Sequence, residues 1–170
     1  MLTRYPSRLA LMALVVAMCA ACSGSTSPTE PDAIGTAPTD FSGQYLGTYL
    51  VTSCSADPLF DGFCGGFPAG TTLPITLSLT QSNKDVTGTV SLGSLTGTFT
   101  GTVSGGVMTA TAVMNDLDSG TGGTTVKVTL ENWSTTMTGS TLTGGFNIVF
   151  RVPSFSGSAT LTARIEQLIR

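Results

Sequence analysis

The four cysteines are the side chains best suited to chemistry in this 170-residue chain, and their positions separate them into two pairs. Cys19 and Cys22 end an apolar stretch near the start of the sequence, whereas Cys54 and Cys64 lie in a segment that contains Pro and Gly. In an oxidising compartment the second pair is expected to form a disulfide, since such bonds persist there. A zinc site is the weaker alternative, because two thiols without histidine supply too few ligands.

Catalytic chemistry has little support, because the chain contains no histidine and only 10% charged residues. Histidine is the commonest general base and the commonest metal ligand. Asp57 and Asp61 could form a carboxylate pair, but two acids in a short loop usually keep it solvated. Residues 115–120 begin like a calcium loop, yet Ser119 occupies position five and no Glu stands at position twelve. We therefore expect no enzyme, with no catalytic residue, no metal and no cofactor.

Near the start of the sequence, two arginines precede an apolar run that ends in Cys19, two alanines and Cys22. These first 22 residues resemble the export signal of bacterial lipoproteins. Small residues before a cysteine match the lipobox, in which that cysteine is acylated, although Cys19 stands where Leu is usual. The resemblance implies a signal peptide over residues 1–21, a lipid anchor on Cys22 and, with Ser23 beside it, an outer-membrane address in the cell envelope. Ordinary cleavage that leaves Cys22 as a plain thiol is the alternative.

Residues 22–40 are rich in Ser, Thr and Pro and lack periodic apolar residues, which is typical of a flexible tether. Residues 41–170 then suffice for one folded domain. From Cys22 onward five basic residues stand against ten acidic ones, a net charge of −5. Without a basic patch, nucleic acid is not expected as a partner. The expected partner is the membrane, reached through the acyl anchor, and the oligomeric state stays open.

From residue 41 onward, apolar residues alternate with hydroxyl-bearing ones in short segments separated by Gly, Asn and Asp. This pattern is typical of antiparallel strands joined by tight turns. Trp133 could extend the sixth segment through a bulge, and only residues 164–170 show any helical tendency. Eight strands are predicted, over residues 43–53, 72–82, 86–92, 95–103, 108–114, 126–130, 142–150 and 155–165.

We predict an all-β domain that closes into an eight-stranded antiparallel up-and-down β-barrel, with a β-sandwich as the alternative. Closure hides every strand edge, and inward-facing glycines permit the bending that closure requires. The outward faces carry Thr and Ser rather than the apolar band of a transmembrane barrel. An eight-stranded interior is either filled by side chains or just wide enough for one small ligand.

The segment from Phe41 to Tyr45 resembles the Gly-x-Trp motif that opens the first strand of lipocalins and related avidin-like barrels, with Gly43 in place and Tyr45 where Trp is usual. A long connection over residues 54–71 follows the first strand, as it does in lipocalins. The resemblance implies a calyx-shaped barrel that takes a ligand at its mouth. It also implies an arginine that closes the barrel base, for which Arg151 and Arg164 are the candidates. No biotin contacts of avidin can be matched.

The long connection is unusually apolar, since it holds Leu59 and three phenylalanines among Pro and Gly. Such a loop either acts as a lid over a ligand or plugs the barrel end as permanent core, and the sequence does not decide between them. We expect a lipid-anchored protein that binds a small apolar molecule; a non-enzymatic structural or interaction lipoprotein with a filled barrel is the alternative. The candidate ligand-binding residues are Tyr45, Tyr49, Phe60, Phe63, Phe67, Phe99, Met108 and Phe146.

Overall fold

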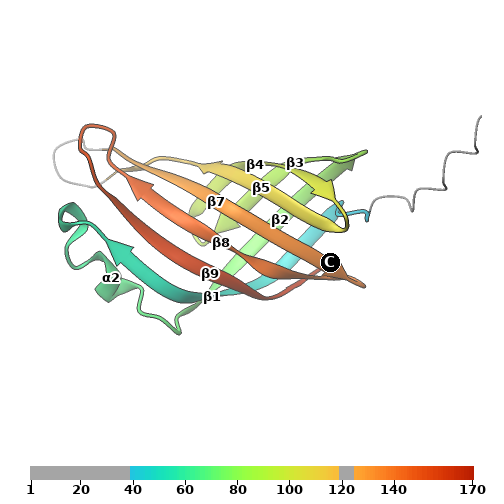
Figure 1. Cartoon of the computed structure of the whole chain (residues 1–170), viewed down its shortest axis with the longest axis horizontal. Coiled ribbons are helices and arrows are strands. Elements are labelled where there is room, and N and C mark those ends of the chain that lie inside the picture. Colours follow the sequence, from blue (N-terminus) through green and yellow to red (C-terminus); the bar gives the residue numbers. More distant parts are fainter. Residues whose placement is uncertain (1–38, 119–124) are drawn as a thin grey trace, which may run out of the picture. The chain divides into compact units, whose positions relative to one another are not determined.

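The computed structural model describes residues 39–118 and 125–170, which form a closed all-β barrel (Figure 1). The predicted signal peptide, Cys22 and the tether up to residue 38 lie outside the described residues. A two-residue strand, β6 (Leu117–Asp118), pairs with the start of β7. The eight long strands of the described chain are β1 (Gly43–Ala56), β2 (Thr72–Ser82), β3 (Asp85–Leu92), β4 (Leu95–Ser104), β5 (Val107–Met114), β7 (Thr125–Thr138), β8 (Thr141–Arg151) and β9 (Ser158–Ile169).

Each of these eight strands pairs with its neighbours in an antiparallel ladder, and the sheet closes on itself. Consecutive long strands pair in chain order, β5 pairs with β7, and β9 returns to pair with β1. Closure leaves no long edge strand unpaired, which removes the sites at which sheets associate edge to edge. The barrel prediction is therefore confirmed, and the sandwich alternative is wrong because the last strand pairs with the first.

Four two-residue turns set the register of the barrel. They lie at residues 83–84, 93–94, 105–106 and 139–140, as the Gly and Asn punctuation predicts. The first turn residue has positive φ at Asn83 (56°), Gly93 (62°) and Gly139 (62°), the backbone geometry of tight hairpins. Because each turn fixes which residues face each other, the apolar sides of all strands point inward together.

The last strand differs from the prediction. β9 begins at Ser158 rather than at residue 155 and continues to Ile169, so the helical tendency of residues 164–170 is wrong. An extra residue bulges β9 after Ile165, and both Ile165 and Leu168 therefore face the core. Their spacing of three imitates a helix in the sequence. β7, in contrast, passes through a bulge at Trp133, as expected, and this residue lies in the interior.

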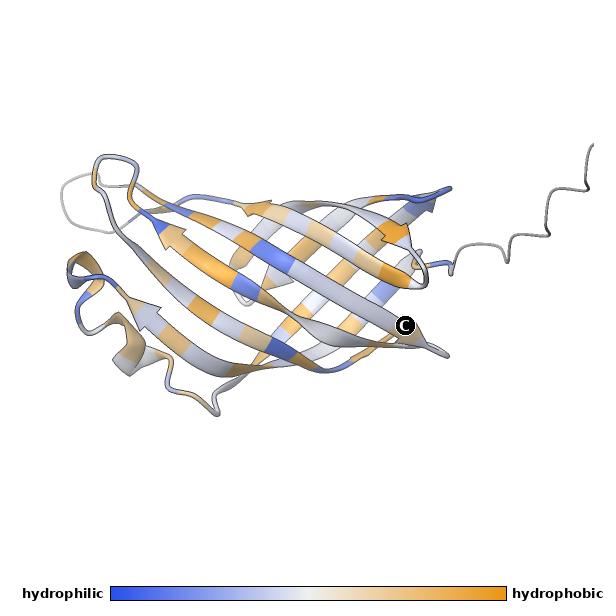
Figure 2. Ribbon diagram, in the orientation of Figure 1, coloured by the Kyte–Doolittle hydropathy of each residue, from blue (hydrophilic) through white to orange (hydrophobic). Residues whose placement is uncertain are grey.

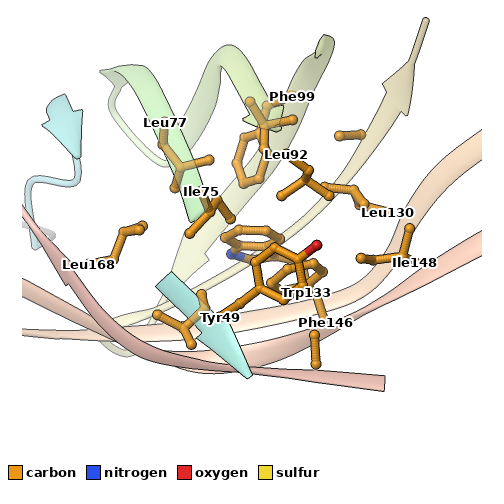
Figure 3. Close-up of a cluster of buried hydrophobic side chains, with 14 of the residues drawn as sticks. Tyr49, Ile75, Leu77, Leu92, Phe99, Leu130, Trp133, Phe146, Ile148 and Leu168 are labelled. Carbon is orange, nitrogen blue, oxygen red and sulfur yellow. The ribbon is translucent and has the colours of Figure 1, made fainter. Parts of the chain in front are cut away.

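An aromatic cluster fills the middle of the barrel. Along each strand, apolar residues alternate with polar ones (Figure 2). Trp133 stacks on Phe146 with ring centroids 4.6 Å apart, and Phe99 meets the indole edge to face at 5.1 Å. Tyr49 completes the group, with its ring 5.5 Å from Phe146 (Figure 3). The indole Nε1 donates a hydrogen bond of 3.2 Å to the buried hydroxyl of Thr135, so the polar group of Trp133 is paired.

Residues beside the start of β1 and the end of β9 close one end of the barrel. Phe41 and Tyr45 are fully buried there, and the Tyr45 hydroxyl donates to the Phe41 carbonyl at 3.0 Å. Arg170 crosses this end and donates from Nη1 to the Ser42 carbonyl at 2.7 Å. Its side chain lies against Gly43, whose φ of 143° explains the glycine at this position.

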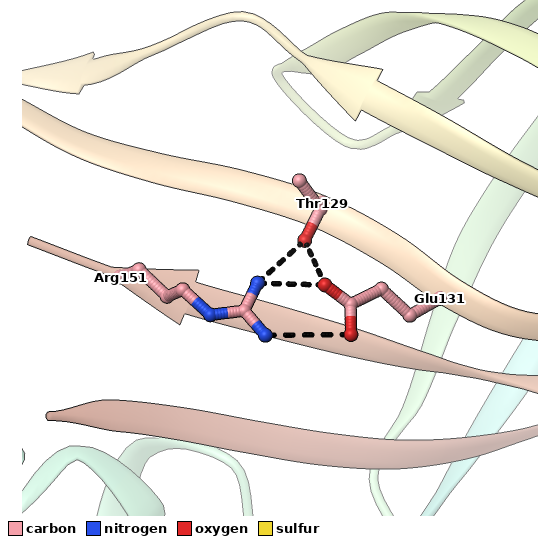
Figure 4. A network of polar contacts seen from close by, with 3 residues as sticks. All are labelled: Thr129, Glu131 and Arg151. Atoms are coloured by element: carbon pink, nitrogen blue, oxygen red, sulfur yellow. Dashed lines mark hydrogen bonds and ion pairs between the residues drawn. The ribbon is translucent and has the colours of Figure 1, made fainter. Parts of the chain in front are cut away.

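The arginine at the closed end is thus neither of the two candidates from the sequence. Arg151 lies on the outside of the barrel, where Nη1 donates to Glu131 Oε1 at 2.6 Å beside Thr129 (Figure 4). Arg164 pairs with Glu166 on the outer face of β9. Both candidates occupy outward positions of the period-two pattern, so neither can cover the interior.

The described helices are short and lie in the β1–β2 connection. They are a 3-10 turn, η2 (Pro58–Phe60), and a four-residue helix, α2 (Phe63–Gly66). Nowhere in the described chain is there a helix of the length and apolar character needed to cross a bilayer.

Candidate ligand-binding cavity

A cavity of about 730 Å³ opens at the end of the barrel opposite Arg170. The β1–β2 connection, the 93–94 turn, Leu117 and the β8–β9 loop surround it. This volume lies within the range of sites that bind small molecules. The barrel is therefore filled in the middle and hollow at one end. The lining residues are Tyr49, Leu59, Phe60, Phe63, Phe67, Leu73, Pro74, Leu92, Gly93, Ser94, Leu95, Leu117, Val126, Ile148, Phe150, Val152, Phe155 and Leu161.

The β1–β2 connection, residues 57–71, is here called the covering loop, and it is fixed to the barrel at several points. A disulfide joins Cys54 in β1 to Cys64 in α2 with a Cα–Cα distance of 5.6 Å, which confirms the predicted pairing. Asp57 accepts a hydrogen bond from the Ser158 amide at its Oδ2 (2.7 Å), and its own amide donates to the Ser158 carbonyl (2.9 Å). These contacts hold the loop against both β1 and β9.

The phenylalanines of the covering loop form one wall of the cavity. Phe63 lies at the centre, with its ring 6.0 Å from Phe60, 5.1 Å from Phe67 and 4.7 Å from Phe150 of β8. All three loop rings are half-buried and pack against the core cluster. They line the cavity and leave its volume open, so the loop here is a wall and does not plug the barrel end.

The lining is apolar in its depth and at its rim. None of the described residues that line the cavity carries a charge. Leu59 and Phe155 stand at the rim with 47% and 59% of their surfaces exposed, although both are large apolar side chains. Exposed apolar residues grouped around a concavity are typical of binding sites for apolar partners.

Tyr49 lies where the cavity meets the filled middle of the barrel. Only 4% of its surface is exposed, and burial raises the pKa of its hydroxyl to about 12. The cause is desolvation, since a phenolate would lose its hydration in this apolar setting. The hydroxyl therefore stays protonated at every physiological pH.

The structure separates the predicted ligand-binding residues into three groups. Tyr49, Phe60, Phe63 and Phe67 line the cavity. Phe99 and Phe146 lie in the aromatic cluster beneath it. The remaining two, Tyr45 and Met108, are fully buried on the strand halves toward the closed end.

Several lining residues were not predicted as ligand contacts. Phe150, Phe155 and Leu117 lie at strand ends or in loops on the open side of the barrel. Counting from the predicted turns gives the direction of each strand and so identifies which strand ends gather at the mouth. That signal was present in the sequence for Phe150, whereas Phe155 was assigned to a strand that starts three residues later.

Two of the acidic residues considered for chemistry, Asp57 and Asp116, have structural partners. Asp116 pairs with Lys127, and the Asn115 side chain accepts from the Thr96 amide at 2.7 Å. The rest of the calcium-like segment, from residue 119, lies outside the described residues. No cluster of three or more metal-ligating side chains occurs in the described ranges.

Comparison with known proteins finds no family model, curated protein or solved structure that matches the chain. The structure is therefore the only support for the barrel fold, and the sequence motifs are the only support for the lipoprotein and lipocalin resemblances.

Proposed function

We propose that this protein is a non-enzymatic, lipid-anchored protein of the cell envelope whose barrel binds a small apolar molecule at its open end. The observation that carries the proposal is the preformed apolar cavity of about 730 Å³ beneath a covering loop that is fastened in place. Burying apolar surface contributes roughly 25 cal/mol per Å². Walls that are already ordered add little entropic cost on binding.

The position of residue 39, where the described chain begins, is compatible with an anchor upstream. β1 begins at the closed end, so residue 39 lies away from the cavity. An acyl anchor upstream, on Cys22, would therefore leave the open end free for a ligand. Each buried CH₂ of an acyl chain contributes about 0.8 kcal/mol to membrane attachment.

Native mass spectrometry of the protein extracted from membranes tests the anchor and the ligand together. We expect a mass increase on Cys22 that is absent from a Cys22→Ser variant, and a small molecule that is released on unfolding. An unmodified Cys22 would contradict the anchor without affecting the cavity.

A direct titration tests binding without detergent. The whole mature chain with Cys22→Ser, exported behind an ordinary secretory signal, is titrated with the neutral fluorophore N-phenyl-1-naphthylamine. We expect saturable enhancement of its emission, with energy transfer from the chain's single tryptophan, Trp133. Absence of saturable uptake of this fluorophore and of aliphatic competitors would contradict ligand binding.

The filled middle of the barrel favours a second candidate, a structural or interaction lipoprotein that takes no ligand. Trp133 and Phe146 stack there and leave no space between them. The two candidates differ in the open end alone, so the same titration distinguishes them.

A further inference from the structure

We infer that the cavity selects neutral apolar molecules with one hydrogen-bonding oxygen, such as long-chain alcohols, aldehydes or ketones, and that the Tyr49 hydroxyl binds this oxygen. The inference rests on the proposed function and names the ligand class of the same site. Three observations carry it: an unpaired hydroxyl, its access to the cavity, and the charges around the mouth.

The Tyr49 hydroxyl has no hydrogen-bond partner among the described residues. Its ring extends from β1 into the interior, where the neighbouring side chains are apolar (Figure 3). Tyr45, four residues earlier on the same face of β1, differs in this respect, since its hydroxyl donates to the Phe41 carbonyl. Buried hydroxyl groups are normally paired, because an unpaired one loses its hydrogen bonds to water without replacement.

The cavity is the space that the Tyr49 hydroxyl reaches. In the part of the chain that the structure describes, no side-chain oxygen or nitrogen is both sealed from the surroundings and unpaired. Because the Tyr49 hydroxyl is unpaired, it must be accessible to solvent-sized molecules. Only 4% of the residue's surface is exposed, so this access is narrow. Tyr49 lines the cavity, so we infer that its hydroxyl is accessible from this side. A ligand oxygen at this position would receive the missing hydrogen bond.

The charges near the mouth disfavour a carboxylate ligand. Lys127 and Arg151 are the basic residues on the mouth halves of the described strands, and each is paired with an acid on the outside. The covering loop adds Asp57 and Asp61, which repel anions. A carboxylate inside the cavity would be buried without a counterion, and burial of an unpaired charge is strongly unfavourable. The protonated Tyr49 could offer it one hydrogen bond only.

The test compares three competitors of equal chain length, decanol, decanoate and decane, in displacing N-phenyl-1-naphthylamine at neutral pH. The protein is the whole mature chain with Cys22→Ser. We expect decanol to bind at least about tenfold more tightly than decanoate, because the ionised carboxylate must be desolvated. Tyr49→Phe should weaken decanol about threefold to tenfold, the effect of one neutral hydrogen bond, and should leave decane unchanged.

Tyr45→Phe is the matched control, since it removes a hydroxyl from the same strand at the closed end. We expect it to leave all three affinities unchanged, and circular dichroism confirms that both variants are folded. Equal binding of decanol and decanoate, or an equal effect of the two substitutions on decanol, would overturn the inference while cavity binding stands. If neither the fluorophore nor any competitor binds, the proposed function fails and the inference with it.

Discussion

At the scale of single residues, Tyr49 links the core to the cavity and gives the protein a defined response to alkali. Burial raises the pKa of its hydroxyl from 10.0 to about 12. The folded protein thus holds this proton more tightly than the unfolded chain does. The free energy of unfolding is therefore unaffected well below pH 10 and falls as the pH rises from about 10 toward 12. A shift of this size corresponds to a loss on the order of 2–3 kcal/mol.

Denaturant unfolding at a series of alkaline pH values measures this loss. In Tyr49→Phe the decline should be smaller, although not absent, because burial also raises the pKa of Tyr45. An equally steep decline in the variant would show that other groups determine the alkaline response.

The difference between the two tyrosines could not be predicted from the sequence. Tyr45 and Tyr49 occupy equivalent inward positions on either side of Gly47, and the period-two pattern assigns each side chain to a face. It does not give the height of a residue along the barrel axis, which decides whether a neighbour, a ligand or water meets its hydroxyl. In contrast, the pairing of Cys54 with Cys64 was predictable, because the two lie close in sequence and the other two cysteines fall in the predicted leader and lipid-anchor site.

At the scale of elements, inward-facing glycines let adjacent strands approach closely. Gly88 lies between Val86 and Val90 on the inner face of β3, and a Cβ there would overlap the carbonyl of Ser78 in β2. The neighbour is backbone and cannot rotate away. Gly88→Ala should therefore lower the free energy of unfolding by about 1–3 kcal/mol, the usual cost of overpacking.

Gly65→Ala is the control for this substitution, because no atom lies within 4 Å of the added Cβ in α2. Its effect, measured by chemical denaturation, should stay within about 0.5 kcal/mol. Equal losses in the two variants would mean that the close approach of β2 and β3 does not limit the choice of residue.

The covering loop depends on its disulfide for part of its order. In the chain-entropy account, a bridge between residues ten apart stabilises the folded state by about 2–3 kcal/mol. We expect the double variant Cys54→Ser with Cys64→Ser to lose up to this amount, because the Asp57–Ser158 hydrogen bonds still hold the loop. The fluorophore should also dissociate from this double variant faster than from the unaltered protein. Unchanged stability and dissociation would show that the bridge is dispensable for the cavity wall.

Strands and turns were predictable because both leave local signals, namely alternation and residues that tolerate positive φ. The ends of β1 and β9 were not. β1 continues to Ala56 because its last three residues, 54–56, pair with residues 159–161 of β9. These two segments are about a hundred residues apart in the sequence, so no local pattern predicts the contact. Bulges have the same origin, since the residue that is squeezed out depends on the partner strand.

At the scale of the whole molecule, the barrel combines a solid half with a hollow half. The sequence supports an eight-stranded cylinder but leaves its interior undecided. At each height along the axis, side chains from eight strands share one cross-section, and their summed volume must match it. Trp133, Phe146 and Phe99 fill the middle section. Near the mouth, inward side chains of the strand ends and phenylalanines of the covering loop line the cavity and leave its volume open.

This division predicts that the cavity can be filled without disturbing the rest of the barrel. Leu73 is half-buried in β2 and lines the cavity, so Leu73→Trp should occupy part of its volume. A ligand at one hundred times its Kd adds about 2.7 kcal/mol to the free energy of unfolding of the unaltered protein. In Leu73→Trp, decanol should add much less to the free energy of unfolding. Without ligand, the variant should unfold at a denaturant concentration similar to that of the unaltered protein, as measured by circular dichroism.

Leu46→Trp provides the comparison, because Leu46 is an apolar residue of β1 whose side chain faces outward, with 67% of its surface exposed. The added indole there should leave the stabilisation by decanol intact. Should both variants keep full stabilisation, the ligand must bind somewhere other than the open end. Should both lose it, the effect would come from an added tryptophan in general, and the separation of a solid core from a hollow mouth would no longer account for binding.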